Sequence, residues 1–210
     1  GIGRFYTSGG TFDVEGNVMS LLYGDNYEGQ TALQGDNQFR GLFDSNLNVV
    51  NASGMTLPAT AMTANCYRSL FGNCTNLESA PTELPATSLA DSCYRYMFSK
   101  TKVANAPSTL PATTLTDYCY YQMFQGTRIT TAPNLPAITL VDYCYYRMFY
   151  DCSNLNYIKC LATDISAEYC TQDWVFGVSS SSGTFVKASS MTSWTTGNNG
   201  IPTNWTVQNA

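Results

Sequence analysis

The sequence predicts an α/β repeat protein in which similar units stack along one axis as a solenoid. Two observations lead to this prediction. A fifteen-residue pattern recurs four times, and each copy is followed by a short apolar stretch that is too brief for a helix. A long pattern that recurs at a fixed interval is typical of units that bury a continuous core between neighbours.

The four copies are nearly identical, and the third reads LPATTLTDYCYYQMF. They are separated by 27, 26 and 25 residues and begin at Leu57, Leu84, Leu110 and Leu135. Weaker copies lie on either side, over residues 39–57 and 160–175. Degraded copies at the ends are expected, because a terminal unit has a neighbour on one side only.

Each unit is predicted to contain one short helix and one short strand. Leu115, Cys119 and Met123 are four residues apart, which is the spacing of one helical face. Sequences of the form S/T-x-x-D precede this face and resemble capping boxes at Ser88–Asp91, Thr114–Asp117 and Thr139–Asp142. Residues 77–80 and their equivalents are bounded by prolines, which favours one brief parallel strand per unit.

The chain is predicted to form a single elongated domain over residues 1–210. Residues 1–38 would be an N-terminal cap of β type, with a hairpin over 11–22. The repeats would extend over 39–187. Residues 188–210 would be a C-terminal cap, also of β type.

Composition excludes several functional classes. Charged residues make up 12% of the chain, about half the usual share, and the net charge is −5. No cluster of Lys and Arg is visible along the sequence, so we expect no nucleic-acid partner. No apolar run is long enough to span a membrane. The chain has no histidine, which removes the commonest general base and metal ligand. We therefore expect no enzyme activity, no cofactor and no metal site.

The eight cysteines are predicted to be buried thiols. Five of them occupy the same position in successive units, namely Cys66, Cys93, Cys119, Cys144 and Cys170. Neighbouring helices would lie about 8–10 Å apart, whereas disulfide-bridged Cα atoms lie within about 7 Å. The carboxylates of Asp91, Asp117 and Asp142 also recur at one position, which favours a structural role over catalysis.

Two surfaces are candidates for ligand binding. On the strand side, residues beside the core positions differ between units and are predicted to dock a protein partner: Glu78, Ser79, Asn105, Thr130, Thr131, Asn156 and Tyr157. On the opposite side, an exposed row of tyrosines would either bind glycans or pack from unit to unit: Tyr96, Tyr118, Tyr121, Tyr143 and Tyr146.

The sequences FGNCTNL at 71–77 and FYDCSNL at 149–155 resemble the F-x-x-C-x-x-L pattern of BspA-like leucine-rich repeats, a family of bacterial surface proteins. The resemblance covers about residues 39–187. The endings NYIKCLATDIS and GTFVKASSMTSW also look like parts of such proteins from gut commensal bacteria. Residues 98–103 and 124–129 depart from the pattern, because they lack the cysteine and are one residue short. The resemblance implies a leucine-rich-repeat solenoid that is secreted or located at the cell surface.

Three functional hypotheses follow from the sequence. The first is a non-enzymatic adhesion module at the cell surface that recognises a protein ligand. The second is a carbohydrate-binding module that uses the tyrosine row. The third is a passive structural spacer that displays another domain. The chain itself shows no signal peptide or membrane anchor, so its localisation is inferred from the family resemblance alone.

Overall fold

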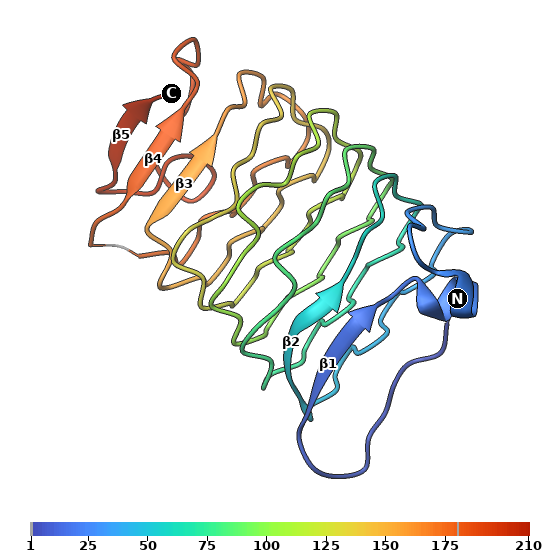
Figure 1. The fold of residues 1–210 in the computed structure, drawn as a ribbon. Helices are drawn as coiled ribbons and strands as arrows, with labels where there is room; N and C mark the ends of the chain where they lie inside the picture. Colours follow the sequence, from blue (N-terminus) through green and yellow to red (C-terminus); the bar gives the residue numbers. More distant parts are fainter. Residues whose placement is uncertain (1, 180) are drawn as a thin grey trace.

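The computed structural model describes residues 2–179 and 181–210 and contains few regular elements (Figure 1). They are, in chain order, β1 (Phe12–Asn17), α1 (Ser20–Tyr23), the 3-10 helix η1 (Gly24–Asn26), β2 (Val49–Thr56), β3 (Tyr157–Cys160), β4 (Thr184–Lys187) and β5 (Thr206–Asn209). The strands form two parallel sheets, one in the order β1-β2 and one in the order β3-β4-β5. Turns, bends and isolated bridges make up most of the remaining described chain.

The prediction of a leucine-rich-repeat solenoid is wrong. The one α-helix in the described residues is α1, which is four residues long and precedes the repeats. The helices expected on one face of every unit are absent from the described repeats, and the two small sheets do not close. The hairpin expected over residues 11–22 is also absent. β1 is a single strand that pairs in parallel with β2, and the chain then enters α1.

Turn segments occupy the positions where helices were expected. They are residues 37–46, 65–74, 92–101, 118–127, 143–152 and 169–178. In the second of them, the amides of Tyr67 and Phe71 donate to carbonyls of the next unit, at N···O distances of 2.9 Å each. The amide of Leu70 instead donates to the carbonyl of Tyr67, three residues earlier, at 3.1 Å. An α-helix would direct every amide to the carbonyl four residues earlier, so these segments are chains of tight turns.

A four-residue period explains why the turn segments resemble helices in sequence. Every fourth residue has the left-handed backbone conformation; Asn65, Ser69 and Asn73, for example, have φ values of 55°, 54° and 58°. Two residues then point inward and two outward, so that Cys66 and Tyr67 are buried and Arg68 is half-exposed. A repeat of four gives the same i, i+4, i+8 spacing as a helical face. A left-handed conformation costs a residue with a Cβ about 1–2 kcal/mol, which the hydrogen bonds between units and the buried core offset.

Proline limits the strands on the other side of the units. The segments that follow the turns contain Ala-Pro pairs at 80–81, 106–107 and 132–133. Proline has no N–H to donate, and these segments form only isolated bridges, such as Thr131↔Tyr157. The equivalent segments of the first and last units contain no proline. Strand β2 forms in the first of these segments and strand β3 in the last. The expected short strand in every unit is therefore found only at the two ends of the stack.

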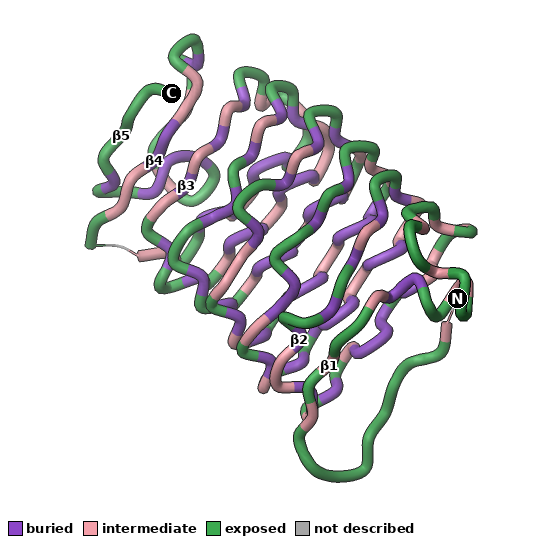
Figure 2. Tube along the Cα trace, viewed as in Figure 1, coloured by how far each residue is buried: buried purple, intermediate pink, exposed green. Residues whose placement is uncertain are grey.

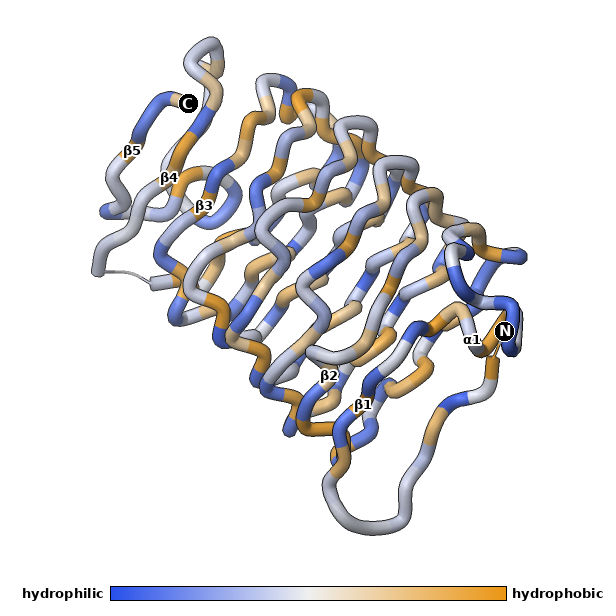
Figure 3. The backbone as a smooth tube through the Cα atoms, in the orientation of Figure 1, coloured by the Kyte–Doolittle hydropathy of each residue, from blue (hydrophilic) through white to orange (hydrophobic). Residues whose placement is uncertain are grey.

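The core lies between the turn segments and the bridging segments and extends from Val18 to Trp205. Figure 2 shows buried positions recurring from unit to unit, and Figure 3 shows hydrophobic and hydrophilic stretches alternating along the units. Two files of buried rings run along the stack, with centroids of neighbouring rings 5.3–6.1 Å apart. Both files meet at Trp174, which stacks on Trp194 at 5.5 Å and whose indole N–H donates to the carbonyl of Gly200 at 2.8 Å. Burial of each large side chain contributes about 1.5–3 kcal/mol.

All eight cysteines are free and buried, as predicted, although the reason given above is wrong. Without helices, the helix-packing distance does not separate the thiols. Burial raises the pKa of the Cys66 thiol to about 11, which keeps it protonated and unreactive. Where the repeat motif lacks its cysteine, Thr101 and Thr127 occupy the position, and their hydroxyls donate to the carbonyls of Phe98 and Phe124.

Candidate binding surface

The outward side chains of the six turn segments form one surface, here called the turn face. Backbone hydrogen bonds between units place equivalent residues side by side. The backbone N–H of Asn65 donates to the backbone carbonyl of Asp91, and that of Ser92 donates to the backbone carbonyl of Asp117. One column of the turn face contains arginine in the first three units and tyrosine in the next two: Arg40, Arg68, Arg95, Tyr121 and Tyr146. This column changes from cationic to aromatic in the middle of the molecule.

The structure brings the five predicted surface tyrosines together as a stacked row. The rings of Tyr118 and Tyr143 are parallel within 10° at 4.7 Å, and those of Tyr121 and Tyr146 within 9° at 4.6 Å. Tyr96 contacts Tyr121 edge to face at 5.4 Å. Because the rings cover one another's faces, the row exposes mainly edges and hydroxyl groups. It is therefore better suited to packing between units than to stacking against sugar rings.

Arg95 lies where the cationic and aromatic parts of the column meet. Its guanidinium is 4.3 Å from the ring centroid of Tyr121, 5.2 Å from that of Tyr118 and 5.0 Å from that of Tyr96. These are cation–π distances. At the far end of the row, Arg147 lies over Tyr146 and pairs with Asp173 at 3.1 Å. Both arginines therefore have partners on the turn face.

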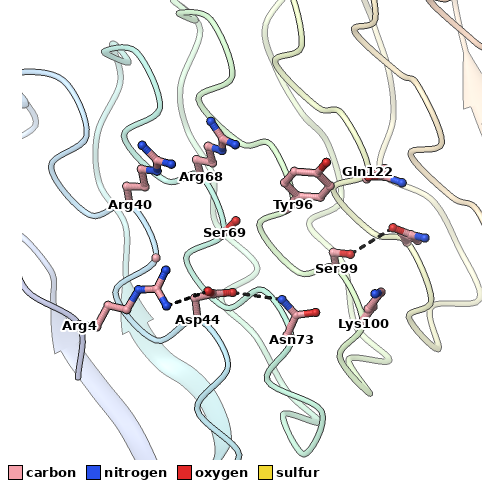
Figure 4. Close-up of a pocket in the computed structure, with 12 residues that line it drawn as sticks. Arg4, Arg40, Asp44, Arg68, Ser69, Asn73, Tyr96, Ser99, Lys100 and Gln122 are labelled. Atoms are coloured by element: carbon pink, nitrogen blue, oxygen red, sulfur yellow. Dashed lines mark hydrogen bonds and ion pairs between the residues drawn. The ribbon is translucent and has the colours of Figure 1, made fainter. Parts of the chain in front are cut away.

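A depression of about 430 Å³ lies on the turn face beside the cationic part of the column. In Figure 4, Arg40 and Arg68 project side by side from neighbouring units, and Arg4 and Lys100 lie across the depression from them. We call this depression the arginine groove. It crosses several units, and its lining extends from Arg4 to Gln125.

Small residues create the arginine groove. Gly41 and Ser69 line the groove. They occupy the position in their own units that is equivalent to that of Arg147 in a later unit. Gly72 and Ser99 similarly occupy the position that Tyr150 fills later in the chain. The backbone geometry is the same in both halves of the turn face. The aromatic half also has a depression, of about 330 Å³, beside Tyr143, Tyr146 and Tyr169. The small side chains therefore accompany the larger of these two hollows.

The arginine groove is positively charged although the chain is acidic. It contains four of the ten basic residues but one carboxylate, that of Asp44. Asp44 is already paired with Arg4 at 3.2 Å and accepts a hydrogen bond from the amide of Asn73 at 3.2 Å. Burial and then the charges of Arg95 and Arg40 lower the pKa of Arg68. The smaller, electrostatic cause is the repulsion that Arg68 experiences from Arg95 and Arg40.

The residues predicted for protein docking lie elsewhere, on the bridging segments, and form the bridge face. Glu78, Thr130, Thr131 and Asn156 are exposed, whereas Ser79, Asn105 and Tyr157 are half-buried. None of them lines the arginine groove. The side chain of Asn105 donates to the carbonyl of Ala80 at 2.9 Å and accepts from its amide at 3.2 Å. Asn105 therefore links two units, and a ligand would have to compete for its amide group.

The repeated carboxylates also contact the backbone of neighbouring units. Asp142 accepts a hydrogen bond from the amide of Glu168 at 2.8 Å, and Asp36 accepts one from Ala64 at 3.0 Å. With no helices to cap, the predicted capping boxes do not exist, and these two acids instead link one unit to the next. Over residues 2–179 and 181–210, no group of three or more Cys, Asp or Glu side chains is arranged to hold a metal ion.

Sequence reasoning missed the arginine groove. The arginines of the column are 27 or 28 residues apart, so no cluster is visible along the chain. The fold brings together basic residues that are far apart in the sequence. Alignment of the repeats by column, which showed the recurring cysteines and tyrosines, would also have placed Arg40, Arg68 and Arg95 together.

No known protein family, curated protein or solved structure matched the chain in our comparisons. The relationship to BspA-like proteins therefore stays a prediction based on the F-x-x-C-x-x-L motif. No described helix is long and apolar enough to cross a membrane.

Proposed function

We propose that this chain is a non-enzymatic binding module that contacts its ligand through the turn face. The observation that carries the proposal is the pair Arg40 and Arg68, which lie side by side and form no hydrogen bond or ion pair with a carboxylate of the described residues (Figure 4). Their side chains donate instead to the neutral amides of Asn37 and Asn65, at 3.5 and 3.3 Å.

The molecule offers an internal comparison for this pair. Arg147 projects from the same face in a later unit and is paired with Asp173. A surface that served stability alone would pair Arg40 and Arg68 in the same way, because adjacent like charges reduce stability. The half-buried Arg68 also loses part of its hydration, as its lowered pKa indicates. An anionic ligand group would offset both costs.

We also propose that the module acts outside the cell, either secreted or at a cell surface, and contributes to adhesion. The support is the resemblance of residues 71–77 and 149–155 to repeats of bacterial surface proteins. The surface chemistry is consistent with this role, since the exposed positions are mostly uncharged polar residues.

A second candidate is docking of a protein partner on the bridge face. The exposure of Glu78, Thr130, Thr131 and Asn156 favours it, because these side chains form a file across successive units. Sugar binding through the ring faces of the tyrosine row has less support, since the rings cover one another. A passive spacer would bind nothing through either face.

Two triple variants separate these alternatives. The first replaces Arg40, Arg68 and Lys100 by glutamine on the turn face. The second combines Glu78→Gln, Thr131→Ala and Asn156→Ala on the bridge face. Wild type and both variants are applied to a glycan array and to a panel of purified extracellular-matrix proteins. We expect the turn-face variant to lose at least tenfold in apparent affinity for any bound spot, and the bridge-face variant to lose less than twofold.

The reverse result would assign binding to the bridge face. Absence of wild-type binding to every spot on both panels would contradict the proposal and favour a spacer. Both variants must retain the wild-type melting temperature within a few degrees, so that lost binding cannot result from unfolding.

A further inference from the structure

We infer that the arginine groove binds a linear acidic saccharide, one that carries sulfate or carboxylate groups along its length. This inference rests on the proposed function and adds the class of ligand. It depends on three features of the groove, namely the charges available, their spacing and the chemistry of the remaining lining.

The available charges are those of Arg40, Arg68 and Lys100. Lys100 is exposed, and its ammonium group has no hydrogen-bond or ion-pair partner in the described part of the chain. Both arginine side chains donate to neutral amides. Arginine presents a planar fork of N–H donors that matches sulfate and carboxylate oxygens. The one acid of the groove, Asp44, is engaged by Arg4 and Asn73. The free cations therefore outnumber the free anions.

The spacing of the cations favours a chain of charges over a single ion. Arg40 and Arg68 occupy equivalent positions in two successive units, which are joined by backbone hydrogen bonds, and Lys100 lines the groove from the next unit. Chains joined in this way lie about 4.8 Å apart. The groove thus presents cations from three successive units. An elongated ligand with regularly spaced acidic groups contacts several cations at once, whereas one phosphate or sulfate ion does not.

The remaining lining distinguishes a saccharide from other polyanions. The groove has no aliphatic side chain; between its cations lie amides and hydroxyls such as those of Asn73, Ser99 and Gln122. These groups both donate and accept hydrogen bonds, as sugar hydroxyls require. An acidic peptide offers carboxylates but no row of hydroxyl groups to pair with these donors and acceptors. Single-stranded nucleic acid gains much of its affinity by stacking bases on open aromatic faces. Tyr96 is the aromatic residue of the lining, and its ring already contacts Tyr121 edge to face at 5.4 Å and the guanidinium of Arg95 at 5.0 Å.

The test measures binding of a heparin-derived hexasaccharide to the whole chain by calorimetry at low salt. The test variant is Arg40→Gln with Arg68→Gln. The control is Arg128→Gln with Lys159→Gln, which makes the same change in net charge outside the groove. We expect Kd to rise at least tenfold in the test variant and less than threefold in the control. Equal weakening in both variants would mean non-specific attraction and would overturn the inference.

Three further ligands define the chemical class. They are the fully desulfated hexasaccharide, a poly-glutamate peptide and a single-stranded DNA of similar charge. The desulfated sugar, which keeps its carboxylates, should bind more weakly but with the same dependence on Arg40 and Arg68. Peptide or DNA binding as tight as that of the hexasaccharide would overturn the assignment to saccharides.

Failure of this inference can be told from failure of the proposed function. If the hexasaccharide does not bind but a matrix protein binds in a way that depends on Arg40 and Arg68, the ligand class is wrong and the turn face remains the binding surface. If neither binds, both proposals fail.

Discussion

In the turn segments 37–46 and 65–74 one outward column contains arginine, whereas in 118–127 and 143–152 the same column contains tyrosine. The tyrosines stack at 4.6 Å, and Tyr143 and Tyr146 border a smaller depression of about 330 Å³. The arginines repel each other and border a depression of about 430 Å³. The backbone is common to both halves, so the fold does not require either residue. The difference indicates that the aromatic half stabilises the stack and that the cationic half is available for binding.

The largest expected effect tests whether the two halves share one core. Leu70 in the cationic half and Met123 in the aromatic half occupy equivalent positions, and both are fully buried. Replacement of either by alanine should cost about 2–5 kcal/mol of unfolding free energy, because a cavity replaces a packed side chain. Denaturant titration measures this cost. A loss below 1 kcal/mol in one half would show that its core is not packed like the other.

The second prediction compares the outer columns directly. A double-mutant cycle on Tyr121→Ala and Tyr146→Ala should give a favourable coupling of about 0.5–1.5 kcal/mol, the value typical of stacked aromatic pairs. The same cycle on Arg40→Gln and Arg68→Gln should give a coupling near zero or unfavourable. Favourable coupling between the arginines would contradict the repulsion inferred from the lowered pKa of Arg68.

The third prediction concerns the file of buried rings formed by Phe39, Tyr67, Tyr94, Tyr120 and Tyr145, which runs through both halves. The hydroxyls of Tyr67, Tyr94 and Tyr120 are buried and have no hydrogen-bond partner among the described residues, whereas the first unit has Phe39 in this position. An unsatisfied buried hydroxyl costs about 1–3 kcal/mol, so Tyr94→Phe should leave the unfolding free energy unchanged or raise it by about 1 kcal/mol. A clear loss of stability on thermal unfolding would mean that the hydroxyl bonds to an ordered water.

A smaller effect is expected from relief of charge repulsion. Arg68→Gln should leave the melting temperature unchanged or raise it slightly at low salt. This difference should shrink as added salt screens the neighbouring charges of Arg40 and Arg95. A drop of several degrees at every salt concentration would instead assign Arg68 a stabilising role.

The smallest effect is the pH dependence contributed by Asp117. Partial burial and then the charges of Asp142 and Asp91 raise the pKa of Asp117. A raised folded-state pKa stabilises the fold below the unfolded pKa, near 3.9, and this contribution is lost as pH rises through the folded pKa. Asp117→Asn should therefore raise the melting temperature slightly at pH 7. The gain should vanish below about pH 3, and a gain that persists there would contradict the cause assigned.

The sequence was a good guide to the units and a poor one to their internal structure. The recurrence of Leu57, Leu84, Leu110 and Leu135 correctly placed the residues that form the core. The spacing of Leu115, Cys119 and Met123 was interpreted as helical, but a chain of turns with every fourth residue left-handed has the same period. Periodicity of apolar residues does not distinguish these backbones. The left-handed positions carry residues such as Tyr118 and Gln122, which give no local signal for that conformation.

The candidate site was predicted in part. The tyrosine row exists where the sequence placed it, because its members fall in adjacent columns of the repeat. The stacking that covers the ring faces depends on the distance between neighbouring units. The helices predicted from the sequence would have placed the units about 8–10 Å apart, too far for their rings to stack in this way. The arginine groove depends on small lining residues such as Gly41 and Ser69, whose effect appears only when neighbouring units are placed side by side.

The most direct test of the account is an NMR titration of the isotope-labelled chain with the hexasaccharide. We expect shifts of backbone amides to concentrate in residues 40–45, 68–73 and 95–100 and at Gln122 and Gln125, which line the groove, with small changes in 146–151. That pattern would place the ligand on the cationic half of the turn face. Shifts concentrated in the bridge face, around residues 78–79, 130–131 and 156–157, or spread equally over both halves of the turn face, would contradict the central claim.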